Sequence, residues 1–125
     1  ILDAVDKTGR PVLCFIDEVL RGTNTVERIA ASSEILKNLN TGRALCFAAT
    51  HDIELTTILK DCYSNYHFQE EVTEDEVKFD YKLYAGPATT RNAIKLLNVI
   101  GYDKNIIKGA EQRAMHFLTD GNWKS

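Results

Sequence analysis

Two stretches of the chain are continuously apolar. Residues 12–16 (VLCFI) and 44–49 (ALCFAA) contain no charged side chain, and polar residues follow each of them at once. Strands that do not alternate with polar positions are typical of a parallel sheet that is covered on both faces. We therefore expect two buried parallel strands, each with both of its faces covered.

The segment between these stretches is predicted to be a helix. Asn24 can cap its start and the turn at residues 40–42 ends it. The residues expected on its buried face recur at helical spacing: Val26, Ile29, Ala30, Ser33 and Leu36. Two strands joined by one crossover helix form a right-handed β-α-β unit, so this part of the chain is predicted to be α/β. Residues 1–8 are typical of the end of a helix.

The pattern changes after a short helix predicted at residues 53–60, for which Asp52 is the expected cap. Residues 77–84 alternate with a period of two, which predicts a strand. Residues 66–72 are its expected partner, and the acidic segment 73–76 joins the two strands into an antiparallel hairpin. Gly86-Pro87 breaks the second strand.

Two helices are expected after this break, at about residues 90–100 and 103–118, with Gly101-Tyr102 between them. The start of the chain has neither a Met nor the basic and apolar regions of a signal peptide. We therefore expect the chain to belong to a longer protein.

Composition narrows the class of protein. Hydrophobic residues make up 44% of the 125 residues and charged residues 26%, which is ordinary for a globular domain or part of one and argues against a membrane location. The net charge of −3 argues against this part being the main nucleic-acid surface, because phosphate binding needs clustered Lys and Arg. The three cysteines form no C-x-x-C pair, which favours free thiols in a reducing cytoplasm.

Three polar segments could carry chemistry, and two of them follow the predicted strands. Asp17-Glu18 ends the first strand, where an Asp can hold Mg²⁺ and a second carboxylate can deprotonate a water. His51 follows the second strand, where an imidazole can contact a phosphate oxygen or orient a water. Each segment alone also fits an ordinary strand end or surface turn. Their order along one β-α-β unit is more specific.

The third segment, Arg21-Gly22-Thr23-Asn24-Thr25, precedes the predicted crossover helix. A glycine before a capped helix start presents free backbone N–H groups and the positive end of the helix dipole, which together favour an anion. An ordinary helix cap with a turn glycine is the alternative for this segment alone.

These residues resemble known motifs. Residues 12–19 are similar to the second nucleotide motif of P-loop ATPases, with the first carboxylate at Asp17. Residues 21–25 resemble the signature loop of the MutS family of DNA mismatch repair ATPases, and residues 49–55 resemble its switch-histidine segment. The hairpin and the closing helices also resemble the end of a MutS ATPase domain. The resemblance implies that residues 1–125 are the C-terminal half of an ABC-like P-loop NTPase domain.

The resemblance also implies roles for single residues. Asp17 would support Mg²⁺, Glu18 would be the general base, and His51 would contact the γ-phosphate or its water. Because MutS ATPase domains pair, the signature loop would complete the nucleotide site of the other subunit through Gly22, Thr23, Asn24 and Thr25. ATP and Mg²⁺ are the expected cofactors, and DNA, bound through other domains, and a second MutS subunit are the expected partners.

Several departures leave the branch of the family open. Asn24 and Leu20 stand where a serine and a glycine are common, and none of the seven glycines is followed by Lys, so the phosphate loop G-x-x-x-x-G-K-[ST] is expected upstream of Ile1. The chain alone is therefore expected to be inactive. The alternatives are a MutS-like paralogue of recombination or other DNA transactions, another ABC-type DNA ATPase, which would carry an L-S-G-G-x signature, and a non-catalytic dimerisation module.

Overall fold

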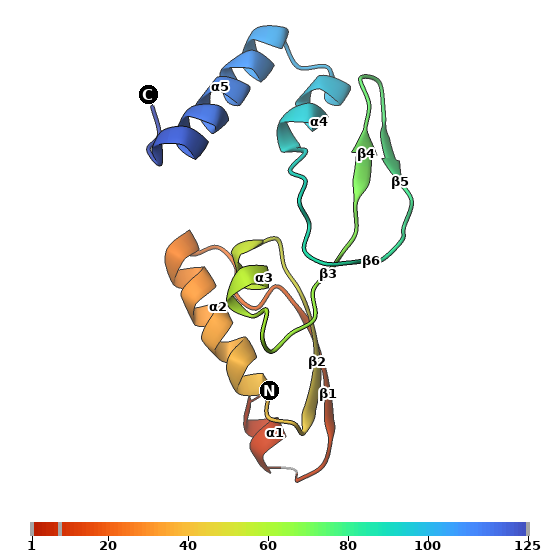
Figure 1. Cartoon of the computed structure of the whole chain (residues 1–125), viewed down its shortest axis with the longest axis vertical. Helices are drawn as coiled ribbons and strands as arrows, with labels where there is room; N and C mark the ends of the chain where they lie inside the picture. Colours follow the sequence, from red (N-terminus) through yellow and green to blue (C-terminus); the bar gives the residue numbers. More distant parts are fainter. Residues whose placement is uncertain (1, 8, 125) are drawn as a thin grey trace. The chain divides into compact units, whose positions relative to one another are not determined.

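The computed structural model describes residues 2–7 and 9–124, whose contacts divide into two compact units. The first unit comprises the chain up to residue 66 together with 85–87, and the second comprises 67–84 and the chain from 88 onward. Figure 1 shows the elements of both. The helix expected at residues 1–8 is present as α1 (Leu2–Lys7), and Ile1 and Thr8 lie outside the described residues.

The first unit is built on the predicted β-α-β arrangement. Strand β1 (Val12–Asp17) pairs in parallel with β2 (Ala44–Ala49), and helix α2 (Thr25–Leu39) connects them. The register places Cys14 opposite Cys46. Both strands and the crossover helix are therefore confirmed, and the chain has a small α/β unit.

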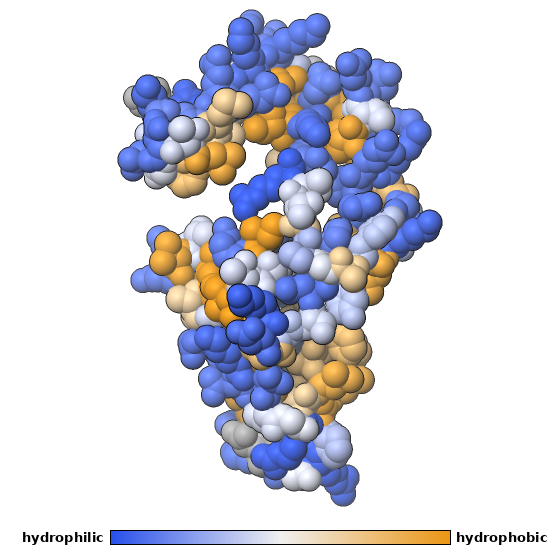
Figure 2. Space-filling view, in the orientation of Figure 1, coloured by the Kyte–Doolittle hydropathy of each residue, from blue (hydrophilic) through white to orange (hydrophobic). Residues whose placement is uncertain are grey.

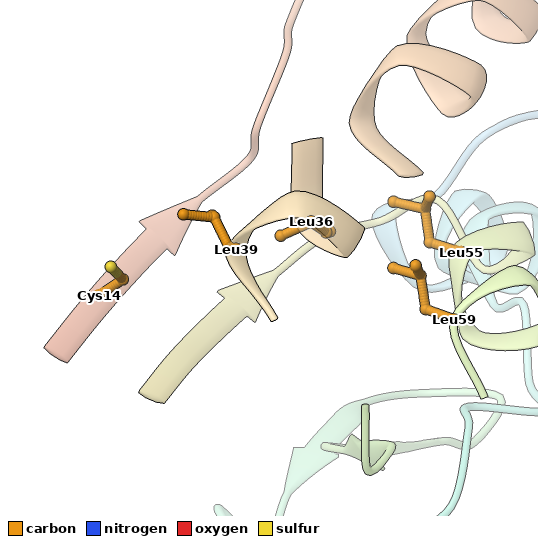
Figure 3. Packing of buried hydrophobic residues seen from close by; sticks show 5 residues of the cluster. All are labelled: Cys14, Leu36, Leu39, Leu55 and Leu59. Carbon is orange, nitrogen blue, oxygen red and sulfur yellow. The ribbon is translucent and has the colours of Figure 1, made fainter. Parts of the chain in front are cut away.

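The core of this unit lies on one face of the β1–β2 sheet. Its buried side chains come from β1, from α2, from α3 (Glu54–Ile58) and from the residue that ends α3. Figure 3 shows them: Cys14, Leu36, Leu39, Leu55 and Leu59. Burial of one leucine side chain contributes about 2 kcal/mol to folding. Beside this cluster the Tyr63 hydroxyl donates to the Leu36 carbonyl oxygen at 2.8 Å, and burial raises the pKa of Tyr63.

The buried face of α2 differs in part from the predicted one. Ser33 and Leu36 are buried and Ile29 is half-buried, as expected. The prediction was wrong for Ala30 and for Val26, which is 75% exposed. In Figure 1 the first turn of α2 lies beyond the carboxyl ends of β1 and β2, so the sheet of this unit does not extend beneath it. The buried positions are instead nearer the end of the helix: Ser32, Ser33, Leu36 and Leu39.

The opposite face of the β1–β2 sheet is exposed, so the expectation that both faces are covered was wrong for this chain. Phe15 and Phe47 are opposite in the register, their rings stack at 5.4 Å, and they are 72% and 54% exposed. Leu13 and Leu45 extend the same apolar face, part of which is visible over the two strands in Figure 2. The reason is that α2 and α3 pack on the Cys14 side, and alternate residues of a strand point the other way.

The second unit contains the predicted hairpin in a shorter form. Strand β4 (Glu70–Val72) pairs antiparallel with β5 (Val77–Phe79), and the Thr73 N–H donates to the Glu76 carbonyl oxygen in the turn. The predicted second strand stops at Phe79, because Asp80 accepts a bond from the Lys82 N–H and Tyr81 has a φ of 56°. The two-residue strands β3 (Tyr66–His67) and β6 (Tyr84–Ala85) pair with each other, and each has one residue in either unit.

The two predicted closing helices are confirmed as α4 (Ala93–Ile100) and α5 (Lys104–Asp120). Gly101 ends α4 with a φ of 96°, a left-handed conformation that glycine adopts at low cost. The Asp103 side chain caps α5 by accepting from the Asn105 N–H. No helix within residues 2–7 and 9–124 is both long and apolar enough to span a membrane.

Candidate functional site

The carboxyl ends of β1 and β2 bring the predicted acidic pair and the predicted histidine to one edge. Asp17 is opposite Ala49 in the parallel register, so Glu18 and His51 follow the two strands side by side. The Glu18 N–H donates to the Ala49 carbonyl oxygen at 2.9 Å, which extends the pairing by one residue. The juxtaposition expected from the sequence is therefore present.

Glu18 adopts a backbone conformation that is unusual for a residue with a side chain. Its φ is 58°, in the left-handed region, which costs about 1–2 kcal/mol for a non-glycine residue. The carboxylate Oε1 accepts from the His51 backbone N–H at 3.0 Å, and the side chain is only 17% exposed. The surrounding bonds thus hold Glu18 in a strained conformation, a feature that clusters at functional sites.

The His51 imidazole, unlike the His51 backbone N–H, is not hydrogen-bonded to Glu18. Its Nε2 lies 3.9 Å from the Glu18 Oε1, beyond hydrogen-bond range, and the side chain is fully exposed. The ring therefore points to solvent at the edge where Glu18 is held. In this position it can contact a ligand that approaches the strand ends.

Asp17 is exposed at the same edge. Its side chain is 82% exposed, and its Oδ2 lies 3.4 Å from the Arg21 guanidinium. An ion pair of this exposure is weak and screened by salt. Asp17 is therefore accessible to a cation, and Arg21 is the nearby group with which a cation would compete.

The loop before α2 has the conformation expected of a capped helix start. Gly22 has a φ of 69°, and the Asn24 Oδ1 accepts from the backbone N–H groups of Val26 and Glu27 at 3.0 and 3.3 Å. Residues 21–25 are all exposed. The sequence therefore predicted the Asn24 cap correctly, and the loop is free to meet a partner surface.

Asp52 does not cap the following helix, which corrects the prediction made for it. The residue at the cap position of α3 is Ile53, and it makes no side-chain cap bond. The Asp52 carboxylate instead accepts two bonds from one guanidinium, from Arg28 Nε at 2.8 Å and Nη2 at 2.6 Å. Two parallel bonds from a charged guanidinium favour this orientation of the carboxylate over a cap on the helix N–H groups.

The Arg28–Asp52 pair is largely buried, with the two side chains 21% and 11% exposed. The hydrogen bonds from Arg28 hold the pKa of Asp52 below its usual value, and the same bonds raise the pKa of Arg28. The sequence alone does not predict a role for Arg28. The only signal was a pair of opposite charges 24 positions apart, which many other pairs in the chain share.

The model of the family described as MutS domain V matches residues 1–118. The chain belongs to the MutS family.

Curated MutS relatives match over most of the chain. A DNA mismatch repair protein MutS from Natronomonas pharaonis is 33% identical over 115 residues, which are 90% of this chain and 13% of that protein. Another from Aquifex pyrophilus is 32% identical over 103 residues, 80% of this chain and 12% of that protein. A DNA mismatch repair protein MutS 2 from Haloarcula marismortui is 28% identical over 123 residues. This MutS chain thus spans 12 to 13% of the length of these relatives.

The carboxylates of this MutS chain fit Mg²⁺ only together with ligands that a bound molecule and water supply. Within the described residues no group of three or more His, Cys, Asp or Glu side chains could hold a metal ion by itself. Mg²⁺ in nucleotide sites is commonly held by one or two carboxylates together with substrate phosphates and waters. The single exposed carboxylate of Asp17 fits that arrangement, in which the nucleotide would supply the other ligands.

Proposed function

We propose that this chain supplies the hydrolytic part of the ATP site in a MutS-like DNA mismatch repair ATPase. The observation that carries the proposal is the anchored Glu18 carboxylate beside the exposed His51 imidazole, at the carboxyl ends of two parallel strands. Ligands of open parallel sheets bind outside these strand ends. The β1–β2 unit would then belong to an ABC-like P-loop NTPase domain.

Each residue has a role that its position supports. Glu18, with one carboxylate oxygen bound to the His51 N–H, would accept a proton from the attacking water. His51 would contact the γ-phosphate or that water. Asp17 would help to hold Mg²⁺, which neutralises phosphate charge when bound.

The loop at residues 22–25 would act on the nucleotide of a second subunit. Its residues are exposed, and they lead into α2, whose first backbone N–H groups and dipole favour an anion. The partner would be a second copy or a paralogous MutS subunit, while DNA would be bound by other parts of the longer protein. ATP turnover would drive conformational change on DNA in the cytoplasm, where the free thiols of Cys14, Cys46 and Cys62 fit a reducing environment.

The second candidate is a MutS-like paralogue that acts in recombination or other DNA transactions. The observation that favours it is Leu20, which stands where a glycine is common in the family. A third candidate, a non-catalytic dimerisation module, is favoured by the uncovered apolar face of β1 and β2. Glu18 separates the third candidate from the other two, because only the ATPases need its carboxylate for turnover.

Nucleotide binding tests whether this chain is one part of a shared site. Calorimetric titration with Mg-ATP should show very weak binding or none to the 125-residue chain, because the phosphate-loop N–H groups and lysine supply most phosphate contacts. A longer form that includes a phosphate loop should bind ATP and hydrolyse it. Micromolar binding to the chain alone, with competition by ADP, would mean that the site has been assigned wrongly.

A further inference from the structure

The Arg28–Asp52 ion pair joins the start of α2 to the turn that carries His51. Arg28 lies in the first turn of α2, and its backbone N–H donates to the Asn24 carbonyl oxygen at 2.8 Å. Its side chain reaches across to the Asp52 carboxylate with two bonds. The start of α2 and the segment before α3 (Figure 1) belong to the same unit.

Each end of this pair is tied to a candidate functional segment. On one side the Arg28 Nη1 donates to the Thr23 carbonyl oxygen at 3.4 Å, within the signature loop. On the other side Asp52 directly follows His51, whose backbone N–H binds Glu18. The Asp52 N–H also donates to the Thr50 hydroxyl at 3.0 Å, so the turn that carries His51 is fixed from both directions.

We propose that Arg28 is a positioning residue: through its bidentate bond to Asp52 it sets the His51 N–H at Glu18 and links that contact to the Thr23–Asn24 loop. The proposal rests on the proposed ATPase function. Arg28 touches no reacting atom in this arrangement. It acts through Asp52 and through the loop carbonyl.

The Arg28–Asp52 pair has the geometry of a positioning contact and not that of an exposed ion pair. The planar guanidinium and the carboxylate form two parallel bonds, which fix orientation as well as distance. The Lys37–Glu34 ion pair does not have this geometry. Lys37 and Glu34, on the same helix, are 3.4 Å apart and 45% and 68% exposed. They therefore offer a matched control.

The experiment uses a longer form of the protein that includes a phosphate loop, with Arg28→Ala, Arg28→Lys and the control Lys37→Ala. Three quantities are measured: the exchange rate of the His51 amide proton, kcat and KM for ATP, and the thermal midpoint. Arg28→Ala should speed His51 exchange and lower kcat by about 10-fold with little change in KM, since displacement by about 1 Å can cost up to about 10²-fold. Amides of the β1–β2 ladder should keep their protection.

Arg28→Lys keeps the charge but cannot form two parallel bonds, so its kcat should lie between those of the wild type and Arg28→Ala. Lys37→Ala should leave all three quantities unchanged. If Arg28→Ala lowers only the thermal midpoint and leaves kcat and His51 exchange unchanged, the proposal is overturned. Absence of turnover in the wild type would refute the proposed function instead, and the exchange measurement would still decide whether Arg28 positions His51.

Discussion

The Glu18 carboxylate accepts a hydrogen bond from the His51 backbone N–H at 3.0 Å, while the His51 imidazole is fully exposed and 3.9 Å away. His51 therefore has two separable parts. Its backbone orients Glu18, and its side chain faces the space where the proposed nucleotide would lie.

Replacing the imidazole should separate these two parts. His51→Ala keeps the backbone N–H at Glu18, so we expect a change in stability within about 0.5 kcal/mol, as for an exposed position. ATP turnover of the longer protein should fall by about 10-fold or more, because a group that contacts the phosphate or the water is lost. Steady-state turnover and urea denaturation measure the two effects. Unchanged turnover would remove the side chain of His51 from the proposed site.

Asn24 is predicted to have both a capping role and a role in trans. Asn24→Ala should lower stability by about 1 kcal/mol, because the N–H groups of Val26 and Glu27 lose their acceptor. Asn24→Ser keeps a cap and should be close to the wild type. Thermal denaturation of the two variants compares them. Equal stabilities of Asn24→Ala and the wild type would contradict the capping geometry.

Mixed dimers test the role of the loop in trans. One subunit carries Glu18→Gln and the other carries a bulky block, Asn24→Trp, and each homodimer should be inactive. In the mixed dimer the Glu18→Gln subunit donates an intact loop to a site with an intact Glu18, so part of the ATPase activity should return. Efficient heterodimer formation without recovered hydrolysis would favour a plain helix cap at residues 22–25.

Lowering the pH should remove the stability that the Arg28–Asp52 ion pair contributes. The Asp52 pKa is lowered by Arg28 from its ordinary value of 3.8, so the stabilisation is present above about pH 4 and is lost as the pH falls through the lower folded-state pKa. The other charges that act on the pair are that of His51 on Asp52 and those of Glu18 and Glu54 on Arg28. Asp52→Asn should be less stable than the wild type at pH 7, and the difference should shrink below pH 4. Urea denaturation from pH 3 to 7 measures it, and a constant difference would contradict the assignment.

Much of the fold could be predicted from the sequence because it depends on local patterns. The apolar runs of β1 and β2 predicted parallel strands, and Asn24 predicted the start of α2. The exposed face of Phe15 and Phe47 could not be predicted, because an apolar run indicates that a face can be buried but not which segment covers it. The early end of β5 was missed because the Asp80 turn interrupts a pattern that otherwise continues.

Local sequence patterns predict only part of the candidate site. Asp17, Glu18 and His51 follow strands, so the parallel register alone brings them to one edge. The bond from the His51 N–H to Glu18 and the Arg28–Asp52 pair depend on side-chain directions. Spacing along the chain does not specify those directions, and Asp52 was therefore assigned as a cap.

The most direct test of the account is the turnover of Glu18→Gln in the longest ATP-hydrolysing form of the protein. The amide oxygen of Gln can still accept from the His51 N–H, so the local structure should be kept while the proton acceptor is lost. The account predicts ATP affinity close to that of the wild type and turnover lower by about 10²-fold or more. Turnover equal to that of the wild type, with ATP binding intact, would contradict the claim that Glu18 is the general base.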